Sequence, residues 1–366
     1  MHGATLRFLR QYFRPRADII DVADATFTRG SETLPATVYR YRGRKRYRTA
    51  WVVLHGITYR GRQHKGLQRF ASSMAAAGHL VFIPEIPEWS RFQVAPALAV
   101  PTIRAAVHAL HDRDDIDRDR IGLFAFSFGG TQSIIAAGDA SIQKELRGLV
   151  SWGGYHSIRT LLEFGFTGEH ELDGQRYQVE PDPYGRWIVG GNYLTRMNGF
   201  EDMDDVARAL LELATAAGTR GIYAGDPMFE PLKAELAQRF TGEKLRVFDV
   251  FAPRGGVVGT DRGLARELID PLSATIIAVD PLMDPTSALS NLNVRTFLAH
   301  GRDDRLIPFT ESLRASRQIP QASMAGCAIT GLFAHSGGTS SSLNTRGKLR
   351  EGGLFLSTLD RALGLI

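Results

Sequence analysis

The chain has 366 residues, 43% of them hydrophobic and 23% charged, which is the composition of an ordinary globular protein with a sizeable core. Its single cysteine, Cys327, excludes an intramolecular disulfide. No run of about 20 apolar residues is present, which excludes a membrane-spanning helix. The net charge of +5 is modest and no nucleic-acid-binding motif accompanies it, so a nucleic-acid partner is not expected.

Residues 1–16 mix apolar side chains with arginines and lack the continuous apolar core of a secretory signal. We expect a short amphipathic helix on the protein's own surface. Contact with an anionic membrane is the alternative, and stable membrane insertion is not expected. The lone cysteine suits a reducing compartment, so the expected location is cytoplasmic. The basic run 42–48 lies between strand-like segments 37–41 and 50–54 and is expected to be a solvated turn.

From residue 51 onward, short apolar runs alternate with segments of helical periodicity. The first helical segments are 67–77 and 102–110, the second with Pro101 at its start. The strand-like runs are 51–54, 80–84, 121–126, 149–152, 294–299 and 324–329. Runs that are apolar on both faces and separated by helices indicate a parallel sheet covered on both sides. The predicted fold class is therefore α/β, with a mostly parallel central sheet and helices on both faces.

One interval, between His156 and Val294, interrupts this alternation. It is too long for a plain loop, since unstructured loops beyond about 15 residues are uncommon. It contains helix-like segments 203–216 and 231–240. We interpret residues 158–287 as a mainly helical cap inserted into a core domain. The core domain then consists of residues 1–157 and 288–366.

The segment Ala125-Phe126-Ser127-Phe128-Gly129 carries the strongest chemical signal. An apolar strand stops at a serine, small residues stand two positions before and after it, and a helix-compatible segment follows. This is the nucleophile-elbow pattern G-x-S-x-G with alanine at the first glycine. A chain that turns sharply from a buried strand into a helix presents such a serine hydroxyl at the apex of the turn.

A serine nucleophile needs a base to take its proton and an acid to orient that base. Downstream of Ser127, a carboxylate follows the strand-like run 294–299, and His335 follows the run 324–329. In an open α/β sheet, ligands bind at the carboxyl ends of the strands, where all three groups are expected. Asp303 and Asp304 both fit the acid position, and the spacing to Pro308 favours Asp304.

With these motifs in order, the chain resembles the α/β-hydrolase superfamily, most of all its esterase and dienelactone-hydrolase-like branches. The resemblance covers about residues 38–157 and 289–363. The matching motifs are His55-Gly56 at the oxyanion loop, the elbow around Ser127, the Gly301-x-x-Asp304-x-x-x-Pro308 acid loop and His335 at the base. The resemblance implies the α/β-hydrolase fold. The segment read as a cap matches no motif.

The resemblance also implies a role for each residue. Ser127 would attack the carbonyl, His335 would take and return the proton, and Asp304 would orient His335. The backbone N–H groups of Phe128 and Ile57 would form the oxyanion hole. No cofactor is implied. No two histidines stand at metal-ligand spacing on a helix, so no metal site is expected.

The remaining histidines and aromatic residues receive simpler interpretations. His55 is expected to support the oxyanion loop and His300 to be a packing residue. His64, His156 and His170 are expected on the surface or in the cap. Two aromatic residues could line a substrate pocket or could form the interior of the cap: Trp187 and Tyr193.

The leading functional hypothesis is a serine hydrolase that cleaves a small-molecule carboxylic ester through an acyl-enzyme intermediate. A thioester or a small amide is an alternative substrate. An acyltransferase would use the same triad with an alcohol or thiol in place of water. A non-catalytic binding module on this fold is the third possibility.

Overall fold

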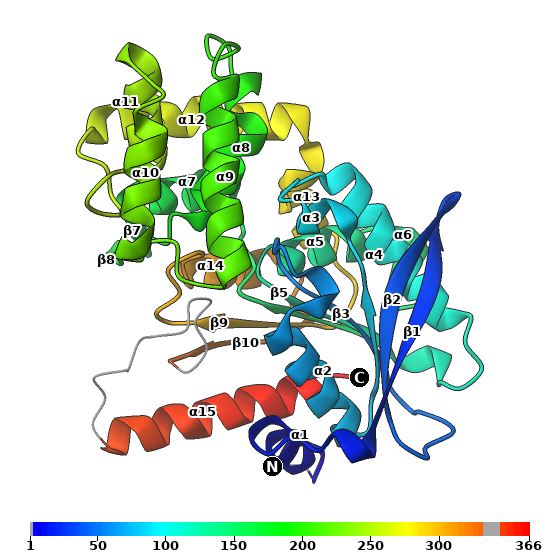
Figure 1. Cartoon of the computed structure of the whole chain (residues 1–366). Helices are drawn as coiled ribbons and strands as arrows, with labels where there is room; N and C mark the ends of the chain where they lie inside the picture. The colour runs from blue at the N-terminus through cyan, green and yellow to red at the C-terminus, as the bar shows by residue number, and fades with distance from the viewer. Residues whose placement is uncertain (1–2, 332–344) are drawn as a thin grey trace.

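The computed structural model describes residues 3–331 and 345–366, which build an eight-stranded sheet with helices on both faces (Figure 1). The strand order is β1-β2-β4-β3-β5-β6-β9-β10. β2 runs antiparallel to β1 and β4, and the other neighbouring pairs are parallel. The strands are β1 (Ile20–Arg29), β2 (Glu32–Tyr41), β3 (Ala50–Leu54), β4 (Leu80–Pro84), β5 (Ile121–Phe126), β6 (Gly148–Trp152), β9 (Thr296–Gly301) and β10 (Met324–Thr330). The predicted mostly parallel α/β architecture is confirmed.

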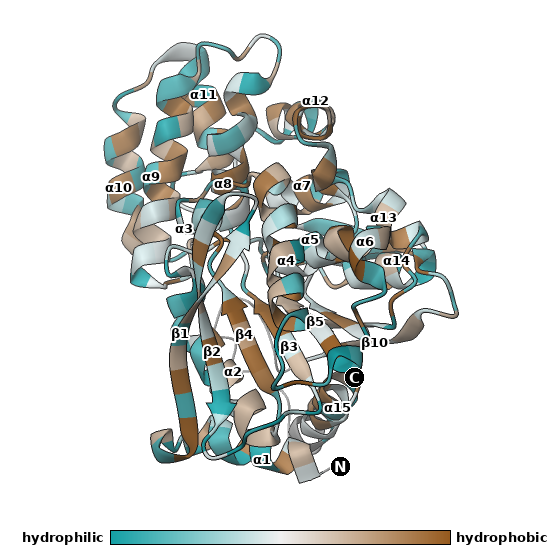
Figure 2. Cartoon of the chain, turned by 90° about the vertical axis from the view of Figure 1, so that its right-hand side faces the viewer, coloured by the Kyte–Doolittle hydropathy of each residue, from teal (hydrophilic) through white to brown (hydrophobic). Residues whose placement is uncertain are grey.

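The central strands are apolar and almost wholly buried, because helices cover the sheet on each side. Figure 2 shows β4 as nearly uniformly hydrophobic, whereas the outer helices mix hydrophobic and hydrophilic residues. One face packs against α4 (Pro96–His111), α5 (Phe128–Ala137), α6 (Ala140–Gln143), α13 (Thr286–Ser290) and α14 (Thr310–Gln318). The other face packs against α1 (Gly3–Phe13), α2 (Lys65–Ala77) and α15 (Thr345–Leu363).

The N-terminal helix α1 lies on the protein's own surface, as expected from its amphipathic pattern. Phe8 is buried and meets Phe70 of α2 edge-on, with ring centroids 5.1 Å apart. Leu6 and Phe13 stay exposed. Within the ranges 3–331 and 345–366, no helix has both the length and the apolar character needed to cross a bilayer.

A long, mainly helical segment is inserted between β6 and β9, which are direct neighbours in the sheet. Figure 1 places its helices together at one end of the molecule. Its elements are α7 (Ile158–Thr167), β7 (Glu169–Leu172), β8 (Gln175–Gln178), α8 (Tyr184–Tyr193), α9 (Asp204–Arg220), α10 (Glu230–Ala237), α11 (Gly242–Phe251) and α12 (Arg262–Val279). These helices bury an apolar cluster separate from the two sheet faces, for example Leu210, Phe248 and Leu272. We call residues 158–287 the inserted segment.

A buried carboxylate fixes the start of the inserted segment to the sheet domain. Glu311 of α14 is fully buried, and its Oε2 accepts the backbone N–H groups of His156 at 3.0 Å and Ser157 at 2.9 Å. Its Oε1 accepts the hydroxyl of Thr160 at 2.8 Å and an N–H of Arg314 at 3.0 Å. One carboxylate on α14 therefore holds both the two residues before α7 and the Thr160 hydroxyl in its first turn.

Two features of the fold differ from the sequence-based expectation. β1 was not predicted, because its burial alternates and its exposed face carries Val22, Asp24, Thr26 and Thr28. Helix α4 begins at Pro96 and holds Pro101 inside, whereas Pro101 was expected at its start. The neighbours Ala99, Val100 and Ile103 are fully buried, so apolar burial offsets the backbone hydrogen bond that a proline removes.

Candidate active site

Ser127 stands at the turn between β5 and α5 in a strained backbone conformation. Its φ of 58° and ψ of −135° fall outside the regions that a residue with a side chain favours. Such a conformation costs about 1–3 kcal/mol and persists only where the surroundings enforce it. Here the Ser127 N–H donates to the carbonyl of Trp152 at 2.8 Å, and the Ser127 carbonyl accepts the N–H of Gly130 at 2.8 Å. The predicted elbow at Ser127 is therefore present as a strand-to-helix turn.

The loop after β3 lies directly against this turn. A β-carbon on Gly129 would stand 2.2 Å from the carbonyl oxygen of His55, and one on Gly56 would stand 2.9 Å from the β-carbon of Ser127. Neither position has room for a side chain. Gly129 in the elbow and Gly56 after β3 therefore allow the backbone of residues 55–57 to approach Ser127.

The two residues predicted to supply oxyanion donors, Phe128 and Ile57, both lie beside Ser127 and line a cavity with it. Phe128 is the first residue of α5, so its N–H is one of the amides that find no acceptor within the helix. The amino end of α5 also carries a partial positive charge. Ile57 follows Gly56 in the loop packed against the turn. The side chains of both residues are partly buried.

Asp304 lies in the turn that follows β9 and has a 3% exposed surface, whereas Asp303 is exposed. Its Oδ1 accepts the backbone N–H groups of Leu306 at 2.9 Å and Ile307 at 3.0 Å. Its Oδ2 is 3.6 Å from Nε2 of His300. These bonds hold the carboxylate in one orientation, and the residue lines the same cavity as Ser127. Of the two candidate acids, only Asp304 has this setting.

His300 contacts the turn that carries Asp304, here called the acid turn. The sequence indicated only a packing role for this residue. The ring is fully buried in β9, and its Nε2 lies 2.9 Å from the carbonyl oxygen of Ile307. Since a carbonyl can only accept, Nε2 carries a proton, and Nδ1 shares a hydrogen bond of 2.7 Å with the hydroxyl of Ser312. The ring therefore connects β9, the acid turn and α14. The four-residue spacing between His300 and Asp304 was the only sequence signal for this contact.

His335 lies outside the described residues. The first described range of residues ends at Gly331, directly after β10, and the second begins at Thr345. The last residue of that strand, Thr330, pairs with Gly301 at the end of β9. Because the two strands are parallel, the chain leaves β10 at the same edge of the sheet at which Asp304 follows β9.

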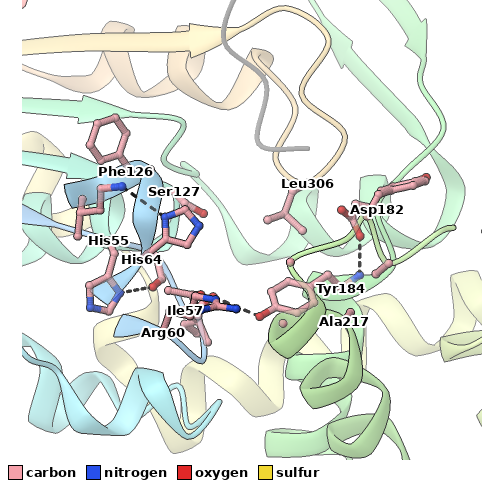
Figure 3. A pocket seen from close by; sticks show the side chains of 18 of the residues that line it. His55, Ile57, Arg60, His64, Phe126, Ser127, Asp182, Tyr184, Ala217 and Leu306 are labelled. Carbon is pink, nitrogen blue, oxygen red and sulfur yellow. Dashed lines mark hydrogen bonds between the residues drawn. The ribbon is translucent and has the colours of Figure 1, made fainter. Parts of the chain in front are cut away.

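A cavity of about 710 Å³ opens above Ser127, between the sheet domain and the inserted segment. Figure 3 shows Ser127 and His64 on one side of it and Tyr184, Asp182 and Ala217 on the other. Polar groups make up much of its described wall. They include Arg60, His64, Asp182, Tyr184, Tyr223, Asp226 and Asp304.

A second, smaller cavity of about 90 Å³ also reaches Ser127. It runs between the elbow and the first helices of the inserted segment. Its described wall is mainly apolar and includes Phe128, Ile158, Leu161, Leu162, Ile188 and Val189. Among the described residues, five line both cavities: Ile57, Ser127, Asp182, Tyr184 and Leu306.

His55 and His64 take different positions in the loop after β3. His55 is buried, its Nδ1 donates to the carbonyl of Gly56 at 2.5 Å, and its ring meets Trp89 edge-on. Burial lowers the pKa of His55, so the ring is neutral near pH 7. His64 is exposed, as expected for a surface residue, yet it lines the large cavity and caps α2 by accepting the N–H of Leu67 at 3.4 Å.

Trp187 and Tyr193 lie in the interior of the inserted segment. Trp187 is fully buried and donates its indole N–H to the carbonyl of Phe251 at 3.0 Å. Tyr193 is 2% exposed and donates its hydroxyl to Asp280 at 2.7 Å. Neither is among the described residues that line the two cavities. Of the two alternatives left open by the sequence, their position matches the cap interior.

No metal centre is formed by the described part of the chain, where no group of three or more His, Cys, Asp or Glu side chains could hold an ion. Cys327 is a lone cysteine in β10, and burial raises the pKa of its thiol to about 11.

Comparison with known proteins gives structural neighbours only: no family model and no curated protein matches the sequence. Over 98% of its length, the chain superimposes on 85% of the esterase Est22 with a TM-score of 0.51 at 14% identity. It also superimposes, over 97% of its length, on the acylaminoacyl peptidase of Pyrococcus horikoshii with a TM-score of 0.51 at 14% identity. The chain has the α/β-hydrolase fold. This chain matches 43% of the peptidase, so that likeness covers less than half of that protein.

The α/β-hydrolase fold explains why the sheet order and the elbow occur together. β5 is flanked by β3 and β6, so Ser127 leaves the middle of the sheet. The loops after β3 and β9 reach the same edge and bring Gly56 and Asp304 toward it. The fold expectation drawn from the motifs is thus confirmed, and the chemistry of the site is a separate question.

Proposed function

We propose that the protein is a serine hydrolase that cleaves a carboxylic ester of a small molecule. The observation that carries the proposal is the strained backbone of Ser127, pressed against Gly56 and opening into the cavity lined by Asp304. Strain that the surroundings enforce at one serine, in a pocket that also holds an oriented buried carboxylate, is typical of an activated nucleophile.

The proposed reaction uses Ser127, His335 and Asp304 as its triad. The hydroxyl of Ser127 adds to the ester carbonyl while His335 takes its proton, and the N–H groups of Phe128 and Ile57 receive the developing negative charge. His335 then protonates the leaving alcohol as the C–O bond breaks, which leaves an acyl group on Ser127. A water molecule, deprotonated by His335, releases the acid and frees the serine.

We assign residues 1–157 and 288–366 to the core domain and residues 158–287 to a cap. The large cavity supports this division, since one part of its wall comes from the loops after β3, β5 and β9 and the other from the inserted segment. In this arrangement the core domain supplies the chemistry and the cap supplies much of the substrate-binding surface.

The test combines a covalent probe with turnover. A fluorophosphonate probe should label the parent protein, and Ser127→Ala should lose both labelling and ester hydrolysis while it melts near the parent temperature. Ser141→Ala, at an exposed position on α6, is the matched control and should behave like the parent. A folded Ser127→Ala variant that still hydrolyses the ester would exclude the assignment.

The same triad would serve an acyltransferase, and product analysis separates the two activities. The parent is given one ester in water with and without a short-chain alcohol. Free acid as the main product in both reactions supports a hydrolase. Transfer of the acyl group to the added alcohol as the main reaction would instead support the acyltransferase. Failure to react with the probe at all would favour a non-catalytic binding module.

A further inference from the structure

Two cavities of very different size and polarity meet at Ser127. The large one is lined by polar side chains such as Arg60 and Asp226 together with apolar ones such as Phe70 and Trp152, whereas the small one runs mainly along apolar side chains of α7 and α8. An ester has two parts that diverge from its carbonyl carbon. Under the proposed function, one part must therefore enter each cavity while the carbonyl rests on the elbow.

The position of Asp304 decides which part goes where. The base that Asp304 orients must protonate the leaving alcohol, so the alcohol has to lie on the same side of Ser127 as that base. Asp304 is among the described residues that line the large cavity and is not among those that line the small one. The alcohol therefore occupies the large cavity, and the acyl group extends into the small cavity.

We infer that the substrate is a short-chain acyl ester of a larger, polar alcohol, with the acyl chain held in the small cavity beside α7. The inference rests on the proposed function. A volume of about 90 Å³ suits a short acyl chain. A cavity that holds benzene is larger, at about 150 Å³.

The alcohol side of the site carries more polar groups among its apolar side chains than the acyl side does. Arg60, Tyr223 and Asp226 line the large cavity and offer donors and acceptors of hydrogen bonds. Asp182 and the hydroxyl-bearing ring of Tyr184 lie where the two cavities meet. An alcohol with several polar groups matches this wall better than a second hydrocarbon chain, because apolar atoms would displace water from these groups without replacing its hydrogen bonds.

Gly165 of α7 lies in the wall of the proposed acyl cavity and has no side chain to fill it. Ile158, Leu161 and Gly165 recur at helical spacing along α7, and all three line the small cavity. A β-carbon on Gly165 would meet no atom within 4 Å. A larger side chain can therefore enter this space without displacing the helix. Leu161, one turn earlier, occupies part of the same wall.

The experiment measures kcat/KM for esters that share one alcohol and differ in acyl length from acetate to decanoate. We expect the highest values between acetate and butyrate, with a drop of about 10-fold or more at hexanoate, in line with the effect of methylene groups on pocket fit. Gly165→Leu should lower kcat/KM for the butyrate ester by about 10-fold relative to kcat/KM for the acetate ester. Leu161→Ala should move the highest kcat/KM to longer acyl chains.

The matched control is Glu163→Leu, which adds the same side chain to α7 at a position that lines neither cavity and is 45% exposed. Its acyl-length profile should equal that of the parent. A preference for octanoate in the parent, or profiles that neither Gly165→Leu nor Leu161→Ala changes, would overturn the inference.

Labelling of Ser127 by a small fluorophosphonate separates this failure from failure of the proposed function. If the parent is labelled while its acyl profile is flat or favours long chains, the hydrolase proposal stands and the short-acyl inference is wrong. If the parent is not labelled, the hydrolase proposal is wrong and the inference falls with it.

Discussion

Gly56 and Ser127 lie so close together that a β-carbon on Gly56 would be 2.9 Å from the β-carbon and 3.0 Å from the hydroxyl oxygen of the serine. Real β-carbons essentially never approach heavy atoms this closely, so the loop would have to move if residue 56 had a side chain. The same loop carries the Ile57 N–H that we propose as an oxyanion donor. The contact between Gly56 and Ser127 therefore determines where that donor stands.

Gly56→Ala should lower kcat by about 100- to 1,000-fold, the usual cost of removing one oxyanion donor. The physical reason is displacement of the loop, so the effect should appear in kcat with one small ester as substrate. Gly256→Ala is the control, because a β-carbon there would meet no atom within 4 Å. Parent-like turnover by Gly56→Ala would mean that the Ile57 amide does not take part.

Asp304→Asn should reduce kcat/KM by about 1,000- to 10,000-fold, because an amide cannot stabilise a protonated base as a carboxylate does. Asp303→Asn should stay within about two-fold of the parent, since an exposed surface substitution has little effect. Both variants should be compared by kcat/KM and by melting temperature. Equal losses in the two variants, or a greater loss in Asp303→Asn, would move the acid role away from Asp304.

His335→Ala should remove nearly all turnover, and the parent should show activity that rises with pH through about 6.5, where an unperturbed histidine loses its proton. The neutral ring is the form that can accept the proton of Ser127. Values of kcat/KM for one ester, measured across a series of pH values, test this rise in activity. A parent profile that is flat from acid to neutral pH would show that no histidine acts as the base.

The stability of the fold should fall in mild acid because of His79. Burial lowers the pKa of His79 from 6.5 to about 4. Its Nδ1 shares a hydrogen bond of 2.6 Å with the hydroxyl of Thr49. Between pH 6.5 and 4 the unfolded chain binds a proton that the folded chain does not. The free energy of unfolding therefore falls as the pH drops through this window, by up to about 1.4 kcal/mol per pH unit for this one group.

His79→Gln should reduce this dependence, because glutamine does not titrate and can still bond to Thr49. Urea unfolding at pH 7 and pH 5 measures the free energy of unfolding of the parent and of His79→Gln at the two pH values. The parent should lose more stability between these two values than the variant does. The same loss in both would assign the acid sensitivity to other groups, among them His170, whose pKa is also lowered to about 4 by burial.

The sequence predicted those parts of the site that depend on local pattern. The strand before the elbow, the small residues around Ser127 and the turn after β9 could be read directly, because each is fixed by neighbours within a few positions. Asp304 could be distinguished from Asp303 by its spacing to Pro308, and its burial and hydrogen bonds agree with that choice.

The rest of the site depends on contacts between distant segments, which a single sequence does not reveal. His64 lies on the wall of the large cavity because the loop after β3 faces α9, and its local sequence resembles an ordinary surface loop. Trp187 and Tyr193 are aromatic residues of the kind expected in a pocket wall, yet tertiary packing places both inside the inserted segment. The described residues that line the small cavity come from seven separate stretches of chain, and no motif marks them.

The direct pairing of β6 with β9 has an evolutionary consequence. The two ends of the inserted segment leave the sheet from adjacent strands, in whose register Leu149 stands beside Thr296. The length of what lies between them does not disturb that register, because lengthening a loop whose ends are already held together costs little. The segment can therefore be exchanged for another as a module. The N–H groups that bind Glu311 belong to His156 and Ser157, which precede the segment, so an exchange would leave them and the sheet edge that carries Ser127 and Asp304 in place.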